Sequence, residues 1–174
     1  MISAHEILPQ KGYLKLAEFF FSNIEEKYLK KNIQHSYSKD IVFLEDYAFL
    51  INALNDLSDR TMNFKYKNLA KELCDETINK FYLNEKGIFQ KNQKNNNDIF
   101  LNPVDISDNT IPNGNAIMLI NFIRLGKNAE AQKLANSLNG YLNIYKNHML
   151  TALRALDFFN NTKDEQNCNE KGAK

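Results

Sequence analysis

The sequence contains no tryptophan, only two cysteines and no long apolar segment. Cys74 and Cys168 lie far apart and form no CxxC pair, so we expect reduced thiols rather than a disulfide framework. No apolar stretch reaches the roughly 18 residues that a membrane-spanning helix needs. The first residues, MISAHEILPQKG, lack the basic and then apolar layout of a secretory signal peptide. These absences together predict a cytoplasmic protein that does not enter a membrane.

An excess of charge of one sign is also missing, because 22 Lys and Arg residues nearly balance 21 Asp and Glu residues. The lysines are spread along the chain instead of forming a basic patch, so we expect neither a nucleic acid nor an anionic membrane as partner. The three histidines lack the spacing of metal ligands, and no Ser-His-Asp constellation can be assigned. The sequence therefore predicts no metal and no cofactor.

Helical periodicity is the main positive signal in this chain of 174 residues, a length that suits one domain. Apolar residues recur at helical spacing in six segments, and the opening MISAHEIL resembles the last turns of a further helix whose beginning is missing. The six segments are residues 12–31, 43–59, 64–82, 114–125, 128–142 and 146–160. Residues 1–160 should form the folded domain, and residues 161–174 should be a disordered polar tail.

The six predicted helices alternate in character along the chain. The first, third and fifth carry most of the charge, whereas the second, fourth and sixth are more apolar. A helix that is apolar on most sides must be covered, and a helix with a charged back belongs outside. The alternation predicts an all-α fold of antiparallel α-hairpins in two layers. A curved solenoid or an (α/α) toroid has this arrangement, and an up-down four-helix bundle does not.

One connection, residues 83–112, is much longer than the others. It holds two short extended segments, GIFQK and DIFLN, on either side of the polar run NQKNNN. This pattern favours a small β-hairpin around residues 87–101 or another ordered excursion. Loops of this length in compact domains are often functional. A disordered Asn-rich insertion is the alternative.

The stretch DNTIPNGNAIMLINF, residues 108–122, could be a hairpin turn, a phosphate-binding loop or the start of a helix. The apolar run after Asn113-Gly114 does not alternate as strands do, and Gly126 beyond it is a natural C-cap. A phosphate loop needs more glycine and a Lys-Ser/Thr pair, which are absent here. We therefore expect a helix start, with Asn113 or Asn115 capping the first backbone N–H groups.

Polar side chains gather where the second, fourth and sixth predicted helices begin. In an antiparallel hairpin array these helices start on the same face, so their first residues should converge on one rim. The residues concerned are Glu45, Asp46, Tyr47, Asp108, Asn113, Asn115 and His148, with His35 in the loop before FLEDYAFL. Carboxylates, amides and a histidine around a concave mouth can bind polyhydroxylated ligands or transfer protons. Each of them can equally be a helix cap or a surface residue.

The segments FLEDYAFLINAL, DNTIPNGNA and HMLTALRALDFF together resemble the thioredoxin domain-containing proteins of the YyaL and spermatogenesis-associated protein 20 type. Similar motifs in that family read L-[ED]-D-Y-A-F-L-I-x-A-L and D-x-A-x-P-S-G-N-S, in the same order and with comparable spacing. Between them, KELCDETINKFYLNEKGIF resembles the family's outer helix and its D-x-x-x-G-x-F turn. The resemblance covers about residues 1–160.

The resemblance implies the final half, about three hairpins, of an (α/α)6 toroid similar to six-hairpin glycosidases and N-acylglucosamine 2-epimerases. The thioredoxin-like domain of that family has no counterpart here, so no redox role is expected. Two positions depart from the family pattern, with Asn113 in place of Ser and Asn109 in place of Gly. The positions that the resemblance places at the cavity are Glu45, Asp46, Tyr47, Asp108, Pro112, Asn113, Gly114 and Asn115.

Three hypotheses follow for function. The first is a fragment of a carbohydrate-directed toroid that takes a sugar-like small molecule, with Glu45 and Asp46 as acid–base groups. The second is a non-catalytic interaction module, whose uncovered apolar helix faces bind the missing hairpins, the thioredoxin-like part or a second copy. The third is a truncated gene product without independent activity. No particular reaction or substrate is predicted.

Overall fold

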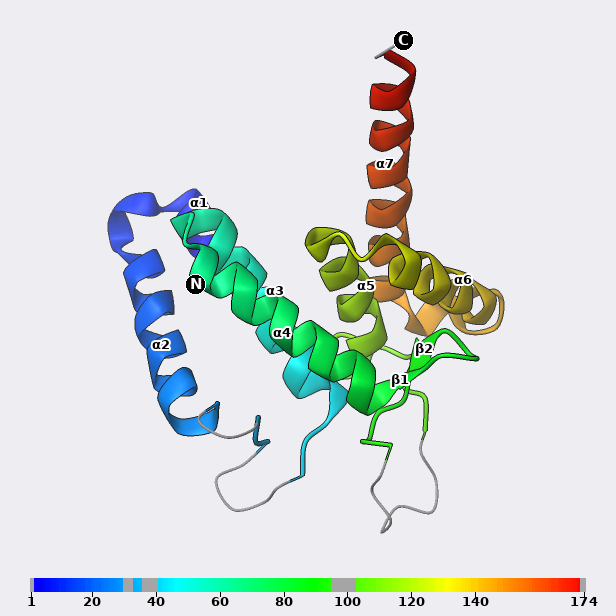
Figure 1. The fold of residues 1–174 in the computed structure, drawn as a ribbon, viewed down its shortest axis with the longest axis horizontal. Coiled ribbons are helices and arrows are strands. Elements are labelled where there is room, and N and C mark those ends of the chain that lie inside the picture. Colours follow the sequence, from blue (N-terminus) through cyan, green and yellow to red (C-terminus); the bar gives the residue numbers. More distant parts are fainter. Residues whose placement is uncertain (1, 30–32, 36–40, 95–102, 173–174) are drawn as a thin grey trace.

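The computed structural model describes residues 2–29, 33–35, 41–94 and 103–172 (Figure 1). Within these residues the chain forms seven α-helices, two short strands and two 3-10 turns. The helices are α1 (Ile2–Ile7), α2 (Tyr13–Tyr28), α3 (Leu44–Thr61), α4 (Phe64–Phe81), α5 (Gly114–Leu125), α6 (Asn128–Tyr145) and α7 (Leu150–Gly172). The strands are β1 (Tyr82–Leu83) and β2 (Ile88–Phe89), and the 3-10 turns are Pro9–Lys11 and Lys146–His148. The all-α class predicted from the sequence is confirmed.

Local capping sets several of the helix boundaries. The side chain of Asn63 accepts a hydrogen bond from the backbone of Lys65 at the start of α4. Asn113 caps α5 in the same way, by accepting from the backbone N–H of Ala116 at 3.0 Å. At the other end of α5, Gly126 takes a left-handed conformation with φ 73°, which glycine adopts without strain. The helix start predicted for residues 108–122 is therefore confirmed.

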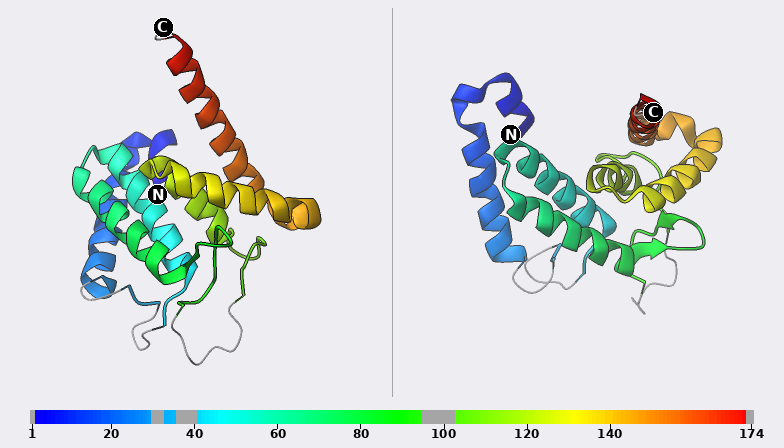
Figure 2. Two further views of the ribbon diagram at one scale, coloured as in Figure 1. Left: turned by 45° about the vertical axis from the view of Figure 1, so that its right-hand side comes forward. Right: turned by 45° about the horizontal axis from the view of Figure 1, so that its top comes forward.

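Helix α5 is the centre of the fold, because eight of its 12 residues are buried. It packs against α3 on one side and against α6 and α7 on the other, and α4 packs along α3. Figures 1 and 2 show the resulting arrangement, with α2 lying at the edge of the molecule beyond α3 and α4. The three more apolar predicted helices, α3, α5 and α7, thus contact one another in chain order.

Buried amides fasten α3 to α5. Asn121 of α5 donates to the backbone oxygen of Ala48 at 2.9 Å and accepts from Asn55 of α3 at 3.4 Å. Both asparagine side chains are fully buried. At the end of α5, Arg124 forms an ion pair with Asp56 of α3 at 2.6 Å. These polar contacts fix the axial position of α5 against α3, which apolar packing alone does not specify.

The structure contains a β-hairpin formed by β1 and β2, which begins upstream of the hairpin predicted around residues 87–101. Strand β2 falls inside the segment GIFQK, as expected, but it pairs antiparallel with β1 immediately upstream, Tyr82 opposite Phe89. Gly87 makes this possible, because its left-handed φ of 63° closes the turn between the strands. The proposed second segment, DIFLN, lies outside the described residues. Strand β1 was not predicted, because Tyr82 was assigned to the preceding helix and Leu83 to the long connection.

Helices α2 and α7 both expose apolar side chains. On α2 these are Leu16, Phe19, Phe20 and Ile24, which are 40–61% exposed. Helix α7 packs on α5 through its first turns and then extends away from the other helices (Figures 1 and 2). The sequence predicts a disordered tail over 161–174, whereas the structure continues α7 to Gly172. The segment contains no proline, and its only glycine is at the end of the helix, so nothing in it breaks the helix.

Candidate functional site

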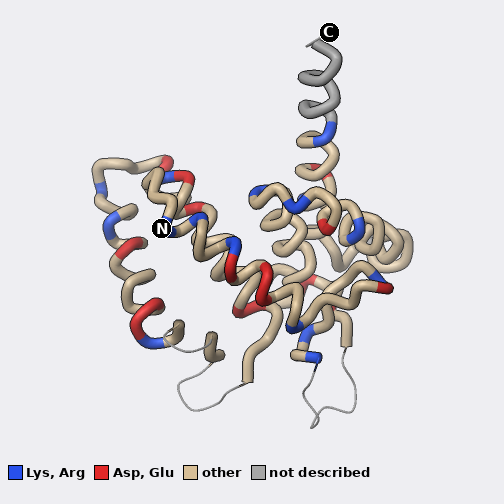
Figure 3. The backbone as a smooth tube through the Cα atoms, in the orientation of Figure 1, with Lys and Arg blue, Asp and Glu red and all other residues tan. Residues whose placement is uncertain are grey.

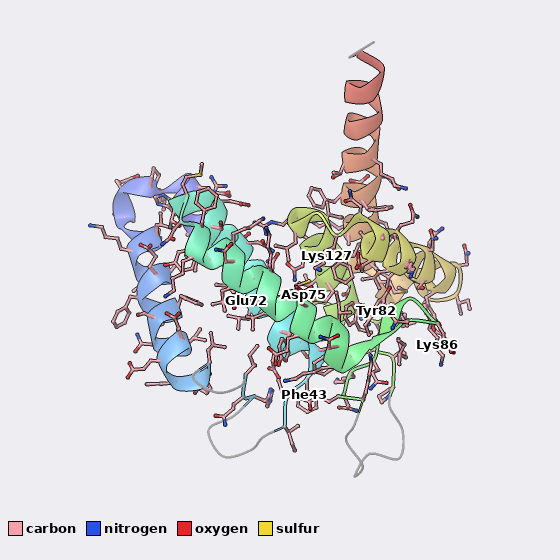
Figure 4. The ribbon with its side chains drawn as sticks, viewed as in Figure 1. Phe43, Glu72, Asp75, Tyr82, Lys86 and Lys127 are labelled. Atoms are coloured by element: carbon pink, nitrogen blue, oxygen red, sulfur yellow. The ribbon has the colours of Figure 1, made fainter. Side chains whose placement is uncertain are left out.

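A cavity of about 660 Å³ lies between the start of α3 and the segment that leads into α5. This volume is in the range of small-molecule sites. Phe43, labelled in Figure 4, directly precedes α3 and forms part of the wall. The lining residues are His35, Phe43, Glu45, Asp46, Phe49, Lys91, Asp105, Ser107, Asn109, Thr110, Ile111, Pro112 and Asn113. We refer to this cavity below as the α3 pocket.

Glu45, in the first turn of α3, has the most unusual environment of the pocket carboxylates. Its Oε2 atom is buried and has no hydrogen-bond partner among the described residues. Burial raises the pKa of the Glu45 carboxyl above its ordinary value, and the nearby charges of Asp105 and Asp46 raise it further. The backbone N–H at the helix start and the charge of Lys91 act in the opposite direction and are outweighed. Glu45 therefore keeps its proton to a higher pH than an exposed glutamate does.

Asp46, the neighbouring carboxylate, is engaged by the protein itself. Its Oδ2 accepts a hydrogen bond from the backbone N–H of Phe43 at 2.9 Å, which caps α3. The same carboxylate accepts from Nδ1 of His35, with distances of 2.9 Å to Oδ1 and 3.1 Å to Oδ2. The predicted pair Glu45 and Asp46 thus lies in one pocket, but of the two only Glu45 has a carboxylate oxygen without a hydrogen-bond partner among the described residues.

The segment that leads into α5 forms the opposite wall. Asp108 connects two helix starts, because its Oδ1 accepts from the backbone of Asn113 at 2.9 Å and its Oδ2 from the backbone of Thr151 at 2.7 Å. Its own backbone N–H donates to the carbonyl oxygen of His148 at 2.7 Å. Asp108 is thus a structural link between α5 and α7, and neither Asp108 nor His148 lines the α3 pocket.

Gly114 and Asn115 lie behind the pocket wall. A Cβ atom on Gly114 would come within 3.2 Å of the Leu44 side chain, so the missing side chain lets α5 approach α3 closely. Asn115 is fully buried and binds both backbone groups of Phe89, accepting from its N–H at 2.9 Å and donating to its carbonyl at 3.0 Å. It also donates to the backbone oxygen of Asp105 at 3.0 Å. Both predicted rim residues therefore support the wall without facing the cavity.

Tyr47 points away from the predicted rim. Its ring is buried between α3 and α4, and its hydroxyl donates to Glu76 at 2.6 Å and accepts from Lys80 at 2.9 Å. Burial and the adjacent Glu76 raise the pKa of the Tyr47 hydroxyl well above its ordinary range. Helical spacing explains the difference, since successive residues of a helix point in directions about 100° apart, and Glu45 and Asp46 already face the pocket.

The pocket residues that the sequence argument missed come from segments distant in the chain. Lys91 reaches the pocket because its carbonyl accepts from the backbone of Leu44 at 3.0 Å and its N–H donates to Pro103. Its ammonium lies 3.6 Å from Asp105. No local sequence pattern predicts that residues 43–44 pair with residues 91–92. Asp105, Ser107 and Thr110 belong to the long connection, and its length was the one feature of the sequence that indicated a functional loop.

No protein-family model matches the chain, and no curated protein matches it. The resemblance to the YyaL type therefore rests on the quoted motifs and stays a prediction. None of the helices in the described ranges combines the length and apolar character that crossing a membrane requires.

In the part of the chain that the structure describes, no three His, Cys, Asp or Glu side chains are grouped as metal ligands would be. Figure 3 shows acidic and basic residues interspersed along the helices.

Proposed function

We propose that the α3 pocket binds a neutral, polyhydroxylated, sugar-like small molecule, with Glu45 as its acid–base group. The observation that carries this proposal is the position of Glu45, which lines a cavity of about 660 Å³ and has a buried Oε2 atom without a described hydrogen-bond partner. A buried carboxyl oxygen without a hydrogen bond raises the free energy of the folded chain, and turning the carboxyl toward a ligand hydroxyl in the cavity would remove that cost.

The rest of the lining suits such a ligand. Phe43 and Phe49 offer flat apolar surfaces on which the C–H face of a sugar ring can stack, while Ser107 and Thr110 add hydroxyl groups. A small set of polar groups among apolar walls is the usual composition of a small-molecule site. Three carboxylates face one lysine and one histidine, and this balance of charge disfavours phosphorylated or carboxylated ligands.

The raised pKa of Glu45 fits the role of a proton donor. A general acid must hold its proton near the working pH and deliver it to a ligand oxygen, and burial moves a glutamate in this direction. We assign Asp46 a different part from the one expected, because its oxygens are occupied by Phe43 and His35. The proposed acid–base function therefore falls to Glu45 and not to a Glu45–Asp46 pair.

We further propose that the chain is part of an (α/α) toroid of the six-hairpin type. The contacts of α3, α5 and α7 in chain order, with α4 beside α3 and α6 beside α5, support this proposal. An inner row of helices flanked by outer ones is the expected layout of such a fold. In toroids the starts of the inner helices border the cavity, and the α3 pocket lies at the start of α3.

A non-catalytic role in protein interaction is the second candidate. The exposed apolar side chains of α2, among them Phe19 at 61% and Phe20 at 46%, favour it, because surface aromatics of this kind mark interfaces. Self-association or binding of the missing hairpins would cover them. Sedimentation of the full chain tests this candidate, and a sharply melting monomer at all concentrations would count against it.

Calorimetric titration of the full chain tests the sugar proposal. D-Glucose, N-acetyl-D-glucosamine and D-glucose 6-phosphate are compared, and the two neutral sugars should bind more tightly than the phosphate. The E45A variant should lose this binding, whereas E85A, which removes an exposed glutamate of the β1–β2 turn, should retain it. Equal affinity of E45A and wild type, or no binding of either neutral sugar, would refute the proposal.

A further inference from the structure

We infer that His35 is the proton acceptor of the α3 pocket and that Asp46 is the residue that orients it. This inference rests on the proposed function, because a proton acceptor has a role only where a ligand binds. It adds a base to the acid already assigned to Glu45. Three contacts of His35, one from Asp46, one from Phe43 and one from Ile41, carry the argument.

The first contact fixes which nitrogen of the ring carries a proton. Nδ1 of His35 lies 2.9 Å and 3.1 Å from the two carboxylate oxygens of Asp46. An ionised carboxylate only accepts hydrogen bonds, so Nδ1 must be the donor. In the neutral ring the other nitrogen, Nε2, then carries the lone pair and is the one able to accept a proton.

Asp46 can hold the ring in place because Asp46 is itself held. Its carboxylate caps α3 by accepting from the backbone of Phe43 at 2.9 Å, so its position is set by the helix start. Its side chain is 22% exposed, compared with 53% for His35. A partly buried carboxylate that orients a more exposed imidazole through Nδ1 is the arrangement that general-base histidines use.

Two further contacts restrict the ring. The imidazole packs edge-on against the ring of Phe43, with centroids 5.0 Å apart and planes at 84°. The backbone N–H of His35 donates to the carbonyl of Ile41 at 3.3 Å. Because Phe43 both contacts the ring and donates to Asp46, the three residues form one unit at the start of α3. The His35 side chain stays 53% exposed, so a ligand can approach the ring.

Glu45 and His35 line the same pocket. The other charged groups of this pocket are Asp46, Asp105 and Lys91. In the reaction step that we propose, the anomeric hydroxyl of a cyclic sugar gives its proton to Nε2 of His35 and becomes the carbonyl of the open-chain aldehyde. The bond between the anomeric carbon and the ring oxygen breaks, and the ring oxygen takes the proton of the Glu45 carboxyl and becomes a hydroxyl. Water then takes the proton from His35 and returns one to Glu45, so the step consumes no oxidant, reductant or further reactant.

Nitrogen-15 NMR of the full chain with labelled histidine tests this inference without any ligand. The H35Q variant identifies the His35 signals among the three histidines. In the neutral wild-type protein we expect His35 to be the Nδ1–H tautomer, with Nε2 unprotonated. A predominant Nε2–H tautomer would overturn the inference.

The D46N variant supplies the second measurement. Its amide oxygen still accepts from Phe43 and caps α3, while its amide nitrogen replaces the oxygen 2.9 Å from Nδ1 and donates to it. The tautomer of His35 should therefore switch to Nε2–H, with a melting temperature close to that of wild type. D157N, which changes an exposed aspartate of α7, should leave the tautomer unchanged. No switch in D46N would contradict the orienting role.

Addition of N-acetyl-D-glucosamine separates this inference from the proposed function. If the sugar binds and shifts the Nε2 resonance of wild type but not that of D46N, the result supports both the sugar-binding proposal and the role of His35 as base. If the sugar binds and the Nε2 resonance stays constant, the pocket is a sugar site and His35 is not its base. If no sugar binds although the Nδ1–H tautomer is present, the proposed function fails and the base has no ligand to act on.

Discussion

Replacing Asn115 by alanine gives the sharpest prediction about the architecture of the pocket wall. The hydrogen bonds Gln90 N–H to Phe81 O and Gly87 N–H to Leu83 O flank the Tyr82–Phe89 pair of the β-hairpin. Backbone groups alternate in direction along a strand, so the N–H and C=O of Phe89 point away from β1. Asn115 binds both of them and is fully buried.

The N115A variant removes both of these bonds and leaves two buried backbone groups of Phe89 without a described partner. Each such group costs about 1–3 kcal/mol, so for the two groups we expect a loss of about 2–6 kcal/mol in the free energy of unfolding. The third bond, to Asp105 O, matters less because Asn113 also donates to that oxygen at 2.9 Å. With a urea m-value of about 2 kcal/mol/M, the midpoint should fall by about 1–3 M.

Urea unfolding followed by circular dichroism measures this change. N139A is the matched control, because Asn139 is exposed on α6, and its midpoint should stay within about 0.3 M of wild type. N115D should be at least as destabilised as N115A, since it turns a carboxylate oxygen toward the carbonyl of Phe89. An N115A midpoint indistinguishable from wild type would refute the account of Asn115 as the support of β2.

Three further outcomes are expected. Because burial raises the pKa of Glu45 in the folded chain, the folded state holds this proton more tightly than the unfolded chain, so stability falls as pH rises from about 4.5 through the folded pKa. E45Q should therefore exceed wild type in stability at pH 7 and lose this advantage below pH 4.5, whereas a pH-independent difference would exclude the burial explanation. Met62 and Gly126 both have left-handed backbones, with φ of 55° and 73°. M62G should therefore stabilise the chain by up to about 1 kcal/mol, and G126A should destabilise it by about 1 kcal/mol. Melting curves that show the opposite signs would contradict this. Y47F should cost only about 0.5–1.5 kcal/mol in urea unfolding, because the ion pair that its hydroxyl contacts persists without it, and a larger loss would mean that the hydroxyl orders that pair.

The helices could be predicted from the sequence because their signals are local. The predicted segment 114–125 has the bounds of α5, since the Asn113 cap and the Gly126 end are both readable in the chain. The pairing of β1 with β2 was not predicted, because it depends on a turn, here closed by Gly87, that resembles ordinary loop composition. The strand that pairs with β2 is determined by tertiary contacts, which local sequence patterns do not indicate.

The candidate site was predictable only in part, for the same reason. Asp46 and Asn113 were read as either caps or ligand groups, and the structure gives both a capping bond and a position on the pocket lining. Lys91 and Asp105 could not be predicted as pocket residues. Backbone hydrogen bonds from Leu44 to Lys91 and from Lys91 to Pro103 bring these parts of the chain to the start of α3. Such bonds join positions far apart in the sequence, and no periodic pattern of residues indicates them.

The claim that the α3 pocket is a ligand site is tested most directly by two-dimensional amide NMR of the full chain during titration with N-acetyl-D-glucosamine. We predict saturable shifts at Glu45, at Lys91 and in residues 105–113, with little change at the exposed apolar face of α2. The same titration of E45A should leave the signals of residues 105–113 in place. Shifts confined to other parts of the molecule, or none with this sugar or with D-glucose, would contradict the claim.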